Sequence, residues 1–267
     1  VVYGVVGLKT HAKMLLVTRR EGRRLRRYVH LSTGNYNSRT AKAYTDLGYM
    51  TCDADITREV DQLFMHVASQ NRLPPLRHLW VAPFKLHDRF LEAIERVGKA
   101  AQAGQPARIV AKMNSLTDER LVQALMTAGQ QGAQIDLIVR GSCILPARVP
   151  GLTDRIRVRS IIGRMLEHTR VFLFQAGSHT ELYLSSADWM NRNMVRRIEI
   201  AWPVKDASLR DRIIAECLGN YLADTQDAWV LQPDGRYKSV AIAPTGKAGG
   251  KRGVSAQSTL MKLYAAL

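Results

Sequence analysis

One arrangement of residues occurs twice in this sequence and limits what the chain can fold into. In the stretch LKTHAKMLLV, His11 and Lys13 stand two residues apart in a run that is typical of a β-strand. Successive side chains of a strand point to opposite faces, so this spacing places the imidazole and the ammonium on one face. The same spacing returns in LEHTRVFLF, with His168 and Arg170. The duplication predicts two related parts, each with a strand that carries a histidine and a cation.

The same two features follow each copy, in the same order. The first is a small polar turn, HLSTGNYN in one copy and LYLSSADWMNRN in the other, and the second is an acidic residue. Asp46 lies eleven residues beyond Asn35, and Glu199 lies eleven residues beyond Asp188. A single His-x-Lys pair is weak evidence for catalysis. Because the whole series recurs, we interpret it as functional. The turn residues that match are Ser32, Thr33 and Asn35 in the first copy and Ser185, Ser186 and Asp188 in the second.

The repeated histidines and acids fit phosphoryl chemistry. A neutral imidazole is a nucleophile for phosphorus near neutral pH. A carboxylate beside the imidazole fixes its tautomer and stabilises the positive ring that forms on attack. We therefore expect Asp46 to orient His11, and Glu199 to orient His168.

The cations and the turns complete the expected site. Lys13 and Arg170 lie on the same strand faces as the histidines, where they would neutralise non-bridging phosphate oxygens. We expect the amide of Asn35 and the hydroxyls beside it to do the same. Phosphoryl transfer depends mostly on positioning and charge stabilisation, so imidazoles and cations supply nearly all the groups that it needs.

The composition is that of a folded protein with one large or two ordinary domains, since 46% of its 267 residues are apolar and 23% are charged. It has no apolar run near the roughly 20 residues that span a bilayer and no secretory leader, so we expect a soluble, unexported protein. Its three cysteines form no CxxC pair, which argues against a disulfide framework or a zinc site and favours the cytoplasm. It begins in mid-strand without an initiator Met, so we expect the back part of a longer protein.

The formal charge of +16 favours a polyanionic partner, such as nucleic acid, an anionic lipid surface or a chain of phosphates. Much of the excess lies in RREGRRLRRY, residues 19–28, where Glu21 and Gly22 suit a hairpin turn. Two interpretations of this arginine ridge stay open: a solvated hairpin tip or a surface that faces a ligand. The six arginines of the ridge are Arg19, Arg20, Arg23, Arg24, Arg26 and Arg27.

The order of predicted elements indicates an α/β fold with mixed, largely parallel sheets covered by helices. We expect a first domain over 1–77 that is incomplete at its N-terminus, a second over 78–233, and a basic flexible tail over 234–267. Pro74 and Pro75 mark the junction. Strands are expected over 1–20, 25–32, 107–114, 133–141, 155–162, 169–175 and 180–186, and helices over 53–70, 90–104, 117–132 and 208–224.

The two His-x-Lys/Arg motifs, with their turns and acids, resemble the phospholipase D superfamily. Neither motif has the Asp that usually follows it, and the second has Arg170 for Lys and Asp188 for Asn. With these departures, the segments GLKTHAKMLLV, YVHLSTGNYN, ARIVAKMNSLTD, IDLIVRG, RIRVRSIIGRMLEH and YLSSADWMNRN are similar to the C-terminal half of the polyphosphate kinase family that carries phospholipase D-like domains. The resemblance runs from about Val1 to Leu231. It implies two phospholipase D-like domains that meet at a shared site.

The resemblance also implies roles for particular residues. The histidine of THAK, here His11, is the one phosphorylated, and the histidine of LEH, here His168, assists as acid-base partner. Tyr44 of YTD and Arg140 of LIVRG match nucleotide-site residues, and Asn35 and His168 are expected to contribute to that site. Lys112 and Asn114 are weaker candidates for the same cleft. The two metal-site arginines of the family lie upstream of the THAK motif by more residues than this chain has, so no metal ligand is assigned.

The reaction implied is reversible transfer of the ATP γ-phosphate to inorganic polyphosphate through phosphohistidine, with Mg²⁺. ATP and polyphosphate would be the partners of a cytoplasmic homo-oligomer that binds no nucleic acid and at most a membrane surface. We expect this chain alone to be nearly inactive. Two alternatives stay open. A phosphodiesterase of the phospholipase D superfamily would act on a diester without ATP, and a non-catalytic polyanion-binding module would bind without either histidine, in a salt-dependent way.

Overall fold

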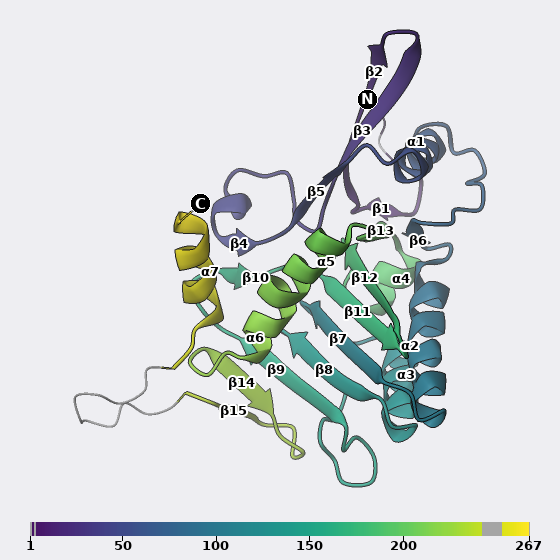
Figure 1. Cartoon of the computed structure of the whole chain (residues 1–267). Helices are drawn as coiled ribbons and strands as arrows, with labels where there is room; N and C mark the ends of the chain where they lie inside the picture. The colour runs from purple at the N-terminus through teal and green to yellow at the C-terminus, as the bar shows by residue number, and fades with distance from the viewer. Residues whose placement is uncertain (1, 3, 242–252, 267) are drawn as a thin grey trace.

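The computed structural model describes residue 2, residues 4–241 and residues 253–266. Within this part of the chain, a ten-stranded mixed sheet runs in the order β1-β13-β12-β11-β7-β8-β9-β14-β15, and β6 pairs with β13 (Figure 1). Its strands are β1 (Lys9–Thr10), β6 (Trp80–Ala82), β7 (Ala107–Met113), β8 (Gln134–Val139), β9 (Ile156–Ile161), β11 (Val171–Ala176), β12 (His179–Ser185), β13 (Arg197–Pro203), β14 (Ala228–Leu231) and β15 (Tyr237–Ser239).

Helices cover both faces of this sheet. Helices α2 (Leu86–Gln102) and α3 (Glu119–Gln130) pack on one face, and the segment from α5 to α6 packs on the other (Figure 1). Strand β7 shows the reason, because Ile109 and Ala111 belong to the core under α2 and α3 while Val110 belongs to the core on the opposite face. The sheet is therefore buried on both sides, which explains the nearly continuous apolar runs of its central strands.

A second, three-stranded sheet projects from the body of the protein (Figure 1). Its strands are β2 (Lys13–Glu21), β3 (Arg24–Ser32) and β5 (Gly48–Thr51). The hairpin turns at Gly22, whose φ of 60° suits glycine, as the sequence predicts. The arginine ridge lies at the projecting tip. Helix α1 (Ala54–Ser69) follows, and Asp53 caps it: the carboxylate accepts from the backbone N–H of Asp55 and Ile56.

Two short parallel pairings join the first part of the chain to the second. Strand β1 pairs with β13, with Thr10 opposite Ile198. Strand β4 (Tyr44–Thr45) pairs with β10 (Leu166–Glu167), with Thr45 opposite Glu167. In both pairs, a strand from the first 50 residues lies beside a strand from beyond residue 160. These pairings bring the two copies of the repeated motif together.

The predicted α/β class and a mixed sheet covered by helices are confirmed. The sheets are less parallel than predicted, since β7–β8, β8–β9 and β1–β13 are the parallel pairs of the large sheet and its other described pairs are antiparallel. Strands β11 and β12 follow each other through a tight turn at Gly177, and such a hairpin can only be antiparallel. The sequence prediction also missed β13 and β6.

The last predicted helix is broken into shorter elements. Helix α5 (Ala207–Ile213) leads into a π-helical stretch, η2 (Ile214–Gly219), and then α6 (Asn220–Leu222). Two further short helices lie elsewhere, η1 (Thr40–Lys42) and α4 (Asn191–Val195). The helical periodicity of residues 208–224 is correct, but it does not reveal the change of hydrogen-bond pattern inside the segment.

The predicted flexible tail over 234–267 is wrong in two described places. Strand β15 pairs with β14, and helix α7 (Ala256–Ala265) begins at Ser255 and buries Ala256 and Gln257. The remainder of the predicted tail, 242–252, lies outside the described residues, as does residue 267. Among the residues that are described, no helix has both the length and the apolar composition that crossing a bilayer requires.

Candidate functional site

Each repeated histidine is hydrogen-bonded to the carboxylate of the other copy. Nδ1 of His11 lies 2.9 Å from Oε2 of Glu199, and Nδ1 of His168 lies 2.9 Å from Oδ1 of Asp46. The expectation that Asp46 holds His11 and Glu199 holds His168 is therefore wrong. The four residues were identified correctly, but their pairing is crossed. Neither half of the constellation is complete without the other.

The register of the two short parallel pairings explains the crossing. Thr10 lies opposite Ile198, so the next residue along each strand is His11 on one side and Glu199 on the other. The backbone N–H groups of His11 and Ala12 both donate to the carbonyl of Ile198. In the second pairing Glu167 lies opposite Thr45, and His168 and Asp46 come next. The crossed arrangement therefore follows from backbone pairing.

A hydroxyl from the small polar turn holds each carboxylate from its own copy. Thr33 Oγ1 donates to Asp46 Oδ1 at 2.7 Å, and Ser186 Oγ donates to Glu199 Oε2 at 2.5 Å. The backbone N–H of the residue after each carboxylate donates back to the same hydroxyl. Ser185 Oγ accepts from the N–H of Ala187 within its own turn, and Ser32 plays the same part in the first copy. The hydroxyls beside Asn35, which we expected to face phosphate, are thus engaged within the protein: Thr33 holds a carboxylate and Ser32 accepts from a backbone N–H.

The hydrogen bonds determine which nitrogen of His11 can react. A carboxylate only accepts, so Nδ1 of His11 carries the proton and the lone pair is on Nε2. Burial lowers the pKa of His11 below its ordinary value of 6.5, although the bond to Glu199 opposes this change. The ring is therefore neutral at pH 7, as a nucleophile requires. Glu199 is fully buried and also accepts from Nδ2 of Asn193 at 2.6 Å.

The two cations of the motif are not equivalent. The Nζ atom of Lys13 lies 3.0 Å from Nε2 of His11, and Lys13 has no ion-pair partner within 4.0 Å in the described part of the chain. Burial lowers its pKa to about 8, so it remains mostly protonated at pH 7. Lys13 thus holds a positive charge beside the reactive nitrogen that no carboxylate neutralises at short range.

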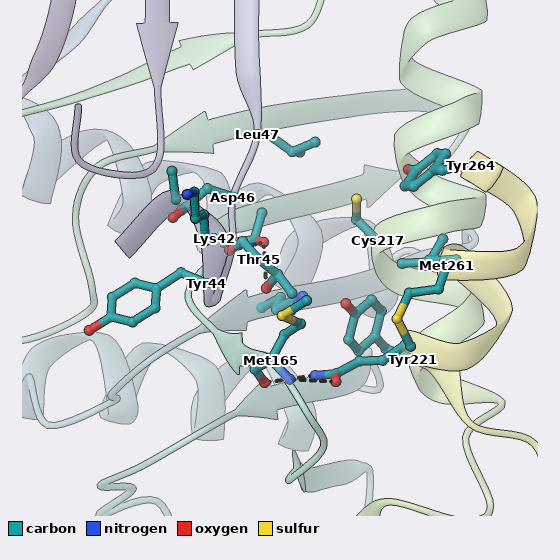
Figure 2. A pocket seen from close by; sticks show the side chains of 15 residues that line it. Lys42, Tyr44, Thr45, Asp46, Leu47, Met165, Cys217, Tyr221, Met261 and Tyr264 are labelled. Carbon is teal, nitrogen blue, oxygen red and sulfur yellow. Dashed lines mark hydrogen bonds between the residues drawn. The ribbon is translucent and has the colours of Figure 1, made fainter. Parts of the chain in front are cut away.

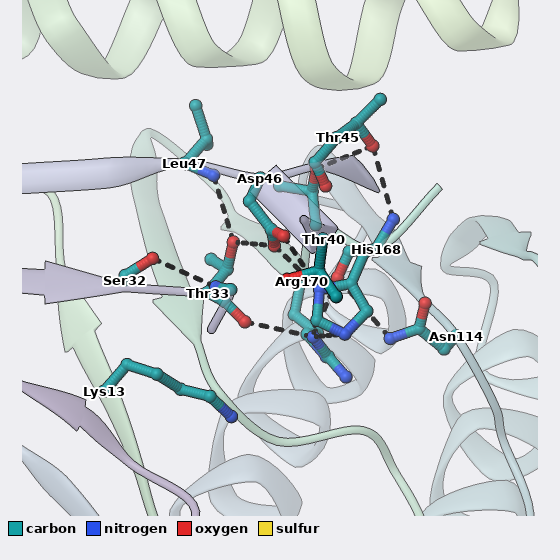
Figure 3. A network of polar contacts seen from close by, with 12 residues as sticks. Lys13, Ser32, Thr33, Thr40, Thr45, Asp46, Leu47, Asn114, His168 and Arg170 are labelled. Carbon is teal, nitrogen blue, oxygen red and sulfur yellow. Dashed lines mark hydrogen bonds and ion pairs between the residues drawn. The ribbon is translucent and has the colours of Figure 1, made fainter. Parts of the chain in front are cut away.

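Arg170 is already bound by an acid. Its Nη2 donates to Oδ2 of Asp188 at 2.9 Å and its Nε to Oδ1 at 3.3 Å. Its Nη1 donates to the carbonyl of Thr33 and lies 3.0 Å from Nε2 of His168 (Figure 3). Burial would raise the pKa of Asp188, but Arg170 and the donors of Asn114 hold it below its ordinary value. Arg170 therefore positions His168 and ties the two copies together, and its charge is less available to phosphate than we predicted.

Of the residues expected at the nucleotide site, Tyr44 lies against His168, and Arg140 is connected to the site through Asn114. The ring of Tyr44 lies 5.2 Å from the imidazole of His168, centroid to centroid. Nε of Arg140 donates to Oδ1 of Asn114, whose Nδ2 donates to Asp188, so Arg140 is joined to the Arg170 network. Asn35 is exposed, and no hydrogen bond of its side chain is found among the described residues.

Several residues that hold the site were not recognised from the sequence. Thr45 and Glu167 precede Asp46 and His168 and bond to each other, and Asn193 holds Glu199. Asn193 stands at the end of LYLSSADWMNRN, the second copy of the small polar turn, which was a usable signal. Thr45 and Glu167 carry no such signal, because their importance depends on the pairing of β4 with β10. Lys112 is not in an open cleft, since it forms a buried ion pair with Glu167 at 2.6 Å.

The described residues do not fit a resident metal ion. They contain no group of three or more His, Cys, Asp or Glu side chains placed to hold one. The carboxylates of Asp46 and Glu199 are each engaged by a histidine and a hydroxyl, and Asp188 is engaged by Arg170. No step below is therefore routed through Mg²⁺.

Comparisons with known proteins lead to one family. A family model described as "Polyphosphate kinase C-terminal domain 1" matches residues 1–73, and one described as "Polyphosphate kinase C-terminal domain 2" matches residues 79–249. A relative named polyphosphate kinase from Xylella fastidiosa (strain 9a5c) is 52% identical over 240 residues, which cover 90% of this chain and 34% of the relative. Another from Burkholderia vietnamiensis is 51% identical over 242 residues, or 89% of this chain and 35% of the relative.

A solved structure leads to the same family. The crystal structure of polyphosphate kinase from Porphyromonas gingivalis aligns with a TM-score of 0.87 at 33% sequence identity, and it covers 98% of this chain and 39% of that one. This chain spans about a third of the length of the curated relatives that it matches. The site lies within the ranges matched by the family models.

The crossed pairing predicts which residues are energetically coupled. In a double-mutant cycle on unfolding in urea, His11→Ala and Glu199→Gln should show a coupling free energy of about 0.5–3 kcal/mol, because they remove the two ends of one partly buried hydrogen bond. His11→Ala and Asp46→Asn serve as the matched control pair and should be additive to within about 0.5 kcal/mol. Strong coupling of His11 to Asp46 but not to Glu199 would contradict the crossed arrangement.

Proposed function

The chain belongs to the polyphosphate kinase family, and on that premise we propose that it forms the catalytic part of an enzyme that transfers the γ-phosphate of ATP reversibly to inorganic polyphosphate. The observation that carries this proposal is the state of His11. Its Nδ1 proton is held by a buried carboxylate, its ring is neutral at pH 7, and Nε2 has a lone pair beside the ammonium of Lys13.

The proposed reaction has two displacements. Nε2 of His11 attacks the γ-phosphorus of ATP, an N–P bond forms, and the bond to the bridging oxygen breaks, so that ADP leaves with the electron pair. The proton stays on Nδ1, where its hydrogen bond to the carboxylate of Glu199 stabilises the positive ring. A terminal oxygen of polyphosphate then attacks the same phosphorus, the N–P bond breaks, and His11 returns to its neutral form. Each displacement is reversible.

The neighbouring residues have supporting roles in this proposal. Lys13 neutralises charge on the transferring phosphoryl group as it approaches Nε2. His168, oriented by Asp46 and Arg170, acts as acid-base partner to the entering or leaving phosphate. Tyr44 and Arg140 contact the nucleotide. Mg²⁺ would come with the ATP phosphates, where it supplies positive charge.

Family membership favours this reaction over the two alternatives left open by the sequence. A diesterase would need no nucleotide, and a non-catalytic polyanion-binding module would need no oriented imidazole. A cytoplasmic location, a homo-oligomeric state and the inactivity of this chain alone stay predictions.

The phosphorylated residue can be identified directly. When γ-labelled ATP is added to a polyphosphate kinase that contains this chain, the label should appear on His11 as an acid-labile, base-stable phosphoramidate. His11→Ala should remove the label, because it removes the nucleophile. The matched variant His168→Ala should slow labelling but leave its site unchanged. If the label persists in His11→Ala and is lost in His168→Ala, the two roles are reversed. If the wild type acquires no label and hydrolyses a diester, the proposed reaction is wrong.

The pH dependence of labelling follows from the two pKa directions. His11 is reactive when neutral, and its lowered pKa places the acid limb of the rate profile below pH 6.5. Lys13 helps when charged, so the rate should fall again as the pH rises through about 8. Lys13→Arg should move the alkaline limb to higher pH, since arginine stays protonated. An alkaline limb that does not move in this variant would exclude Lys13 as its source.

The arginine ridge should affect binding of the polymer more than the chemistry. Its tip projects from the body, and five of its six arginines are exposed (Figure 1). Neutralising Arg19, Arg20, Arg23 and Arg24 should raise the KM for long polyphosphate and flatten its salt dependence, because fewer counterions are exchanged. Removal of four positive charges from α2 and α3 surfaces serves as the charge-matched control. An unchanged KM at low and high salt would leave the ridge as a solvated hairpin.

A further inference from the structure

A buried polar cluster lies next to His168, and the proposed reaction does not use it. The carboxylate of Glu167 is almost fully buried and accepts three hydrogen bonds: from Nζ of Lys112 at 2.6 Å, from Oγ1 of Thr45 at 2.8 Å and from Nε2 of Gln257 at 2.5 Å. The Nζ atom of Lys112 also lies 3.6 Å from the centroid of the Tyr221 ring. A buried ion pair is costly to desolvate, and this one is kept by bonds from several elements.

Gln257 joins this cluster from the C-terminal helix α7. Its Oε1 accepts from the backbone N–H of Met165 at 2.8 Å, and its Nε2 donates to the carbonyl of Met165 at 2.8 Å. These are the two bonds that a residue on an antiparallel neighbour would exchange with Met165. The amide of Gln257 thus takes the place of a strand at the edge that leads into β10. Residue 257 lies beyond both ranges matched by the family models.

The cluster reaches His168 through the backbone. His168 directly follows Glu167, and its N–H donates to Oγ1 of Thr45, the same hydroxyl that donates to Glu167. Thr45 directly precedes Asp46, whose carboxylate holds the imidazole of His168. The position of the ring and the position of its carboxylate therefore both depend on the segment that Glu167 and Thr45 share.

Packing alone does not fix this segment. A cavity of about 240 Å³ lies between it and α7, lined by Thr45, Asp46 and Met165 on one side and by Met261 and Tyr264 on the other (Figure 2). This pocket is partly open to solvent, so the side chains that line it have no packed protein neighbours on that side. Hydrogen bonds therefore contribute to the position of β10, and those of Gln257 come from α7 itself.

We propose that Gln257 is a positioning residue for the reaction: it fixes β10 from α7 and, through Glu167 and Thr45, keeps His168 aligned with Asp46. Its effect on turnover rests on the proposed function, and its effect on the His168 ring does not. The C-terminal helix would then contribute to the active site without touching the substrate.

The test compares Gln257→Ala with Asn220→Ala. Nδ2 of Asn220 donates to the carbonyl of Ala256, so this control loosens the docking of α7 without touching β10. In a polyphosphate kinase that contains this chain, Gln257→Ala should lower kcat about tenfold with little change in the KM for ATP, since a displacement of about 1 Å can cost roughly a hundredfold in rate. Asn220→Ala should keep the wild-type kcat, although both variants lower the Tm. Gln257→Met, which keeps the volume and removes the hydrogen bonds, serves if the alanine variant unfolds.

A second readout does not depend on activity. In ¹⁵N spectra of this chain, the protonated Nδ1 of His168 should shift in Gln257→Ala and stay unchanged in Asn220→Ala. If the longer wild-type protein that contains this chain shows no kinase activity but the His168 signal shifts as stated, the proposed function fails and the positioning role stands. A wild-type kcat and an unchanged His168 signal in both Gln257 variants would overturn the positioning role. Equal losses in Asn220→Ala would overturn it too, because they would assign the effect to docking of the helix.

Discussion

The site depends on an exchange of short strands between the two copies of the repeated motif. Strand β1 of the first copy lies beside β13 of the second, and β10 of the second lies beside β4 of the first. Each pairing is only two residues long, yet its register places a histidine opposite a carboxylate from the other copy. Two residues are enough because each carboxylate is also held by a hydroxyl of its own turn. Backbone pairing thus supplies the alignment, and the turns supply the rigidity that phosphoryl transfer needs.

The two copies differ in how their cations are bound, and this difference favours different roles for the two histidines. Arg170 is bound through two nitrogens to Asp188, and this acid is held in turn by Asn114. Lys13 has no such partner in the described part of the chain, and burial lowers its pKa. The copy with Lys13 therefore presents a charge that phosphate can use, whereas the copy with Arg170 presents a fixed scaffold. This difference supports His11 as nucleophile and His168 as helper.

The sequence identifies the residues that form the site better than it identifies their hydrogen-bond partners. His11, His168, Asp46 and Glu199 were found because the motif repeats, and a repeat is visible without a structure. Their pairing was not found, because it depends on β13, whose alternation is obscured by buried Glu199 and whose neighbours come from distant segments. The hydroxyl of Thr33 was assigned to phosphate because the sequence shows its type but not its partner, which is Asp46. Gln257 was placed in a flexible tail, since a Lys- and Gly-rich stretch before it suggests no packed helix.

The central claim is that each histidine is oriented by the carboxylate of the other copy, and imidazole ¹⁵N spectra of this chain test it most directly. In the wild type, both His11 and His168 should show a protonated Nδ1. Glu199→Gln should shift the signal of His11 and leave that of His168 in place, whereas Asp46→Asn should do the reverse. Should Glu199→Gln shift only His168, and Asp46→Asn only His11, each carboxylate would belong to the histidine of its own copy and the account would be contradicted.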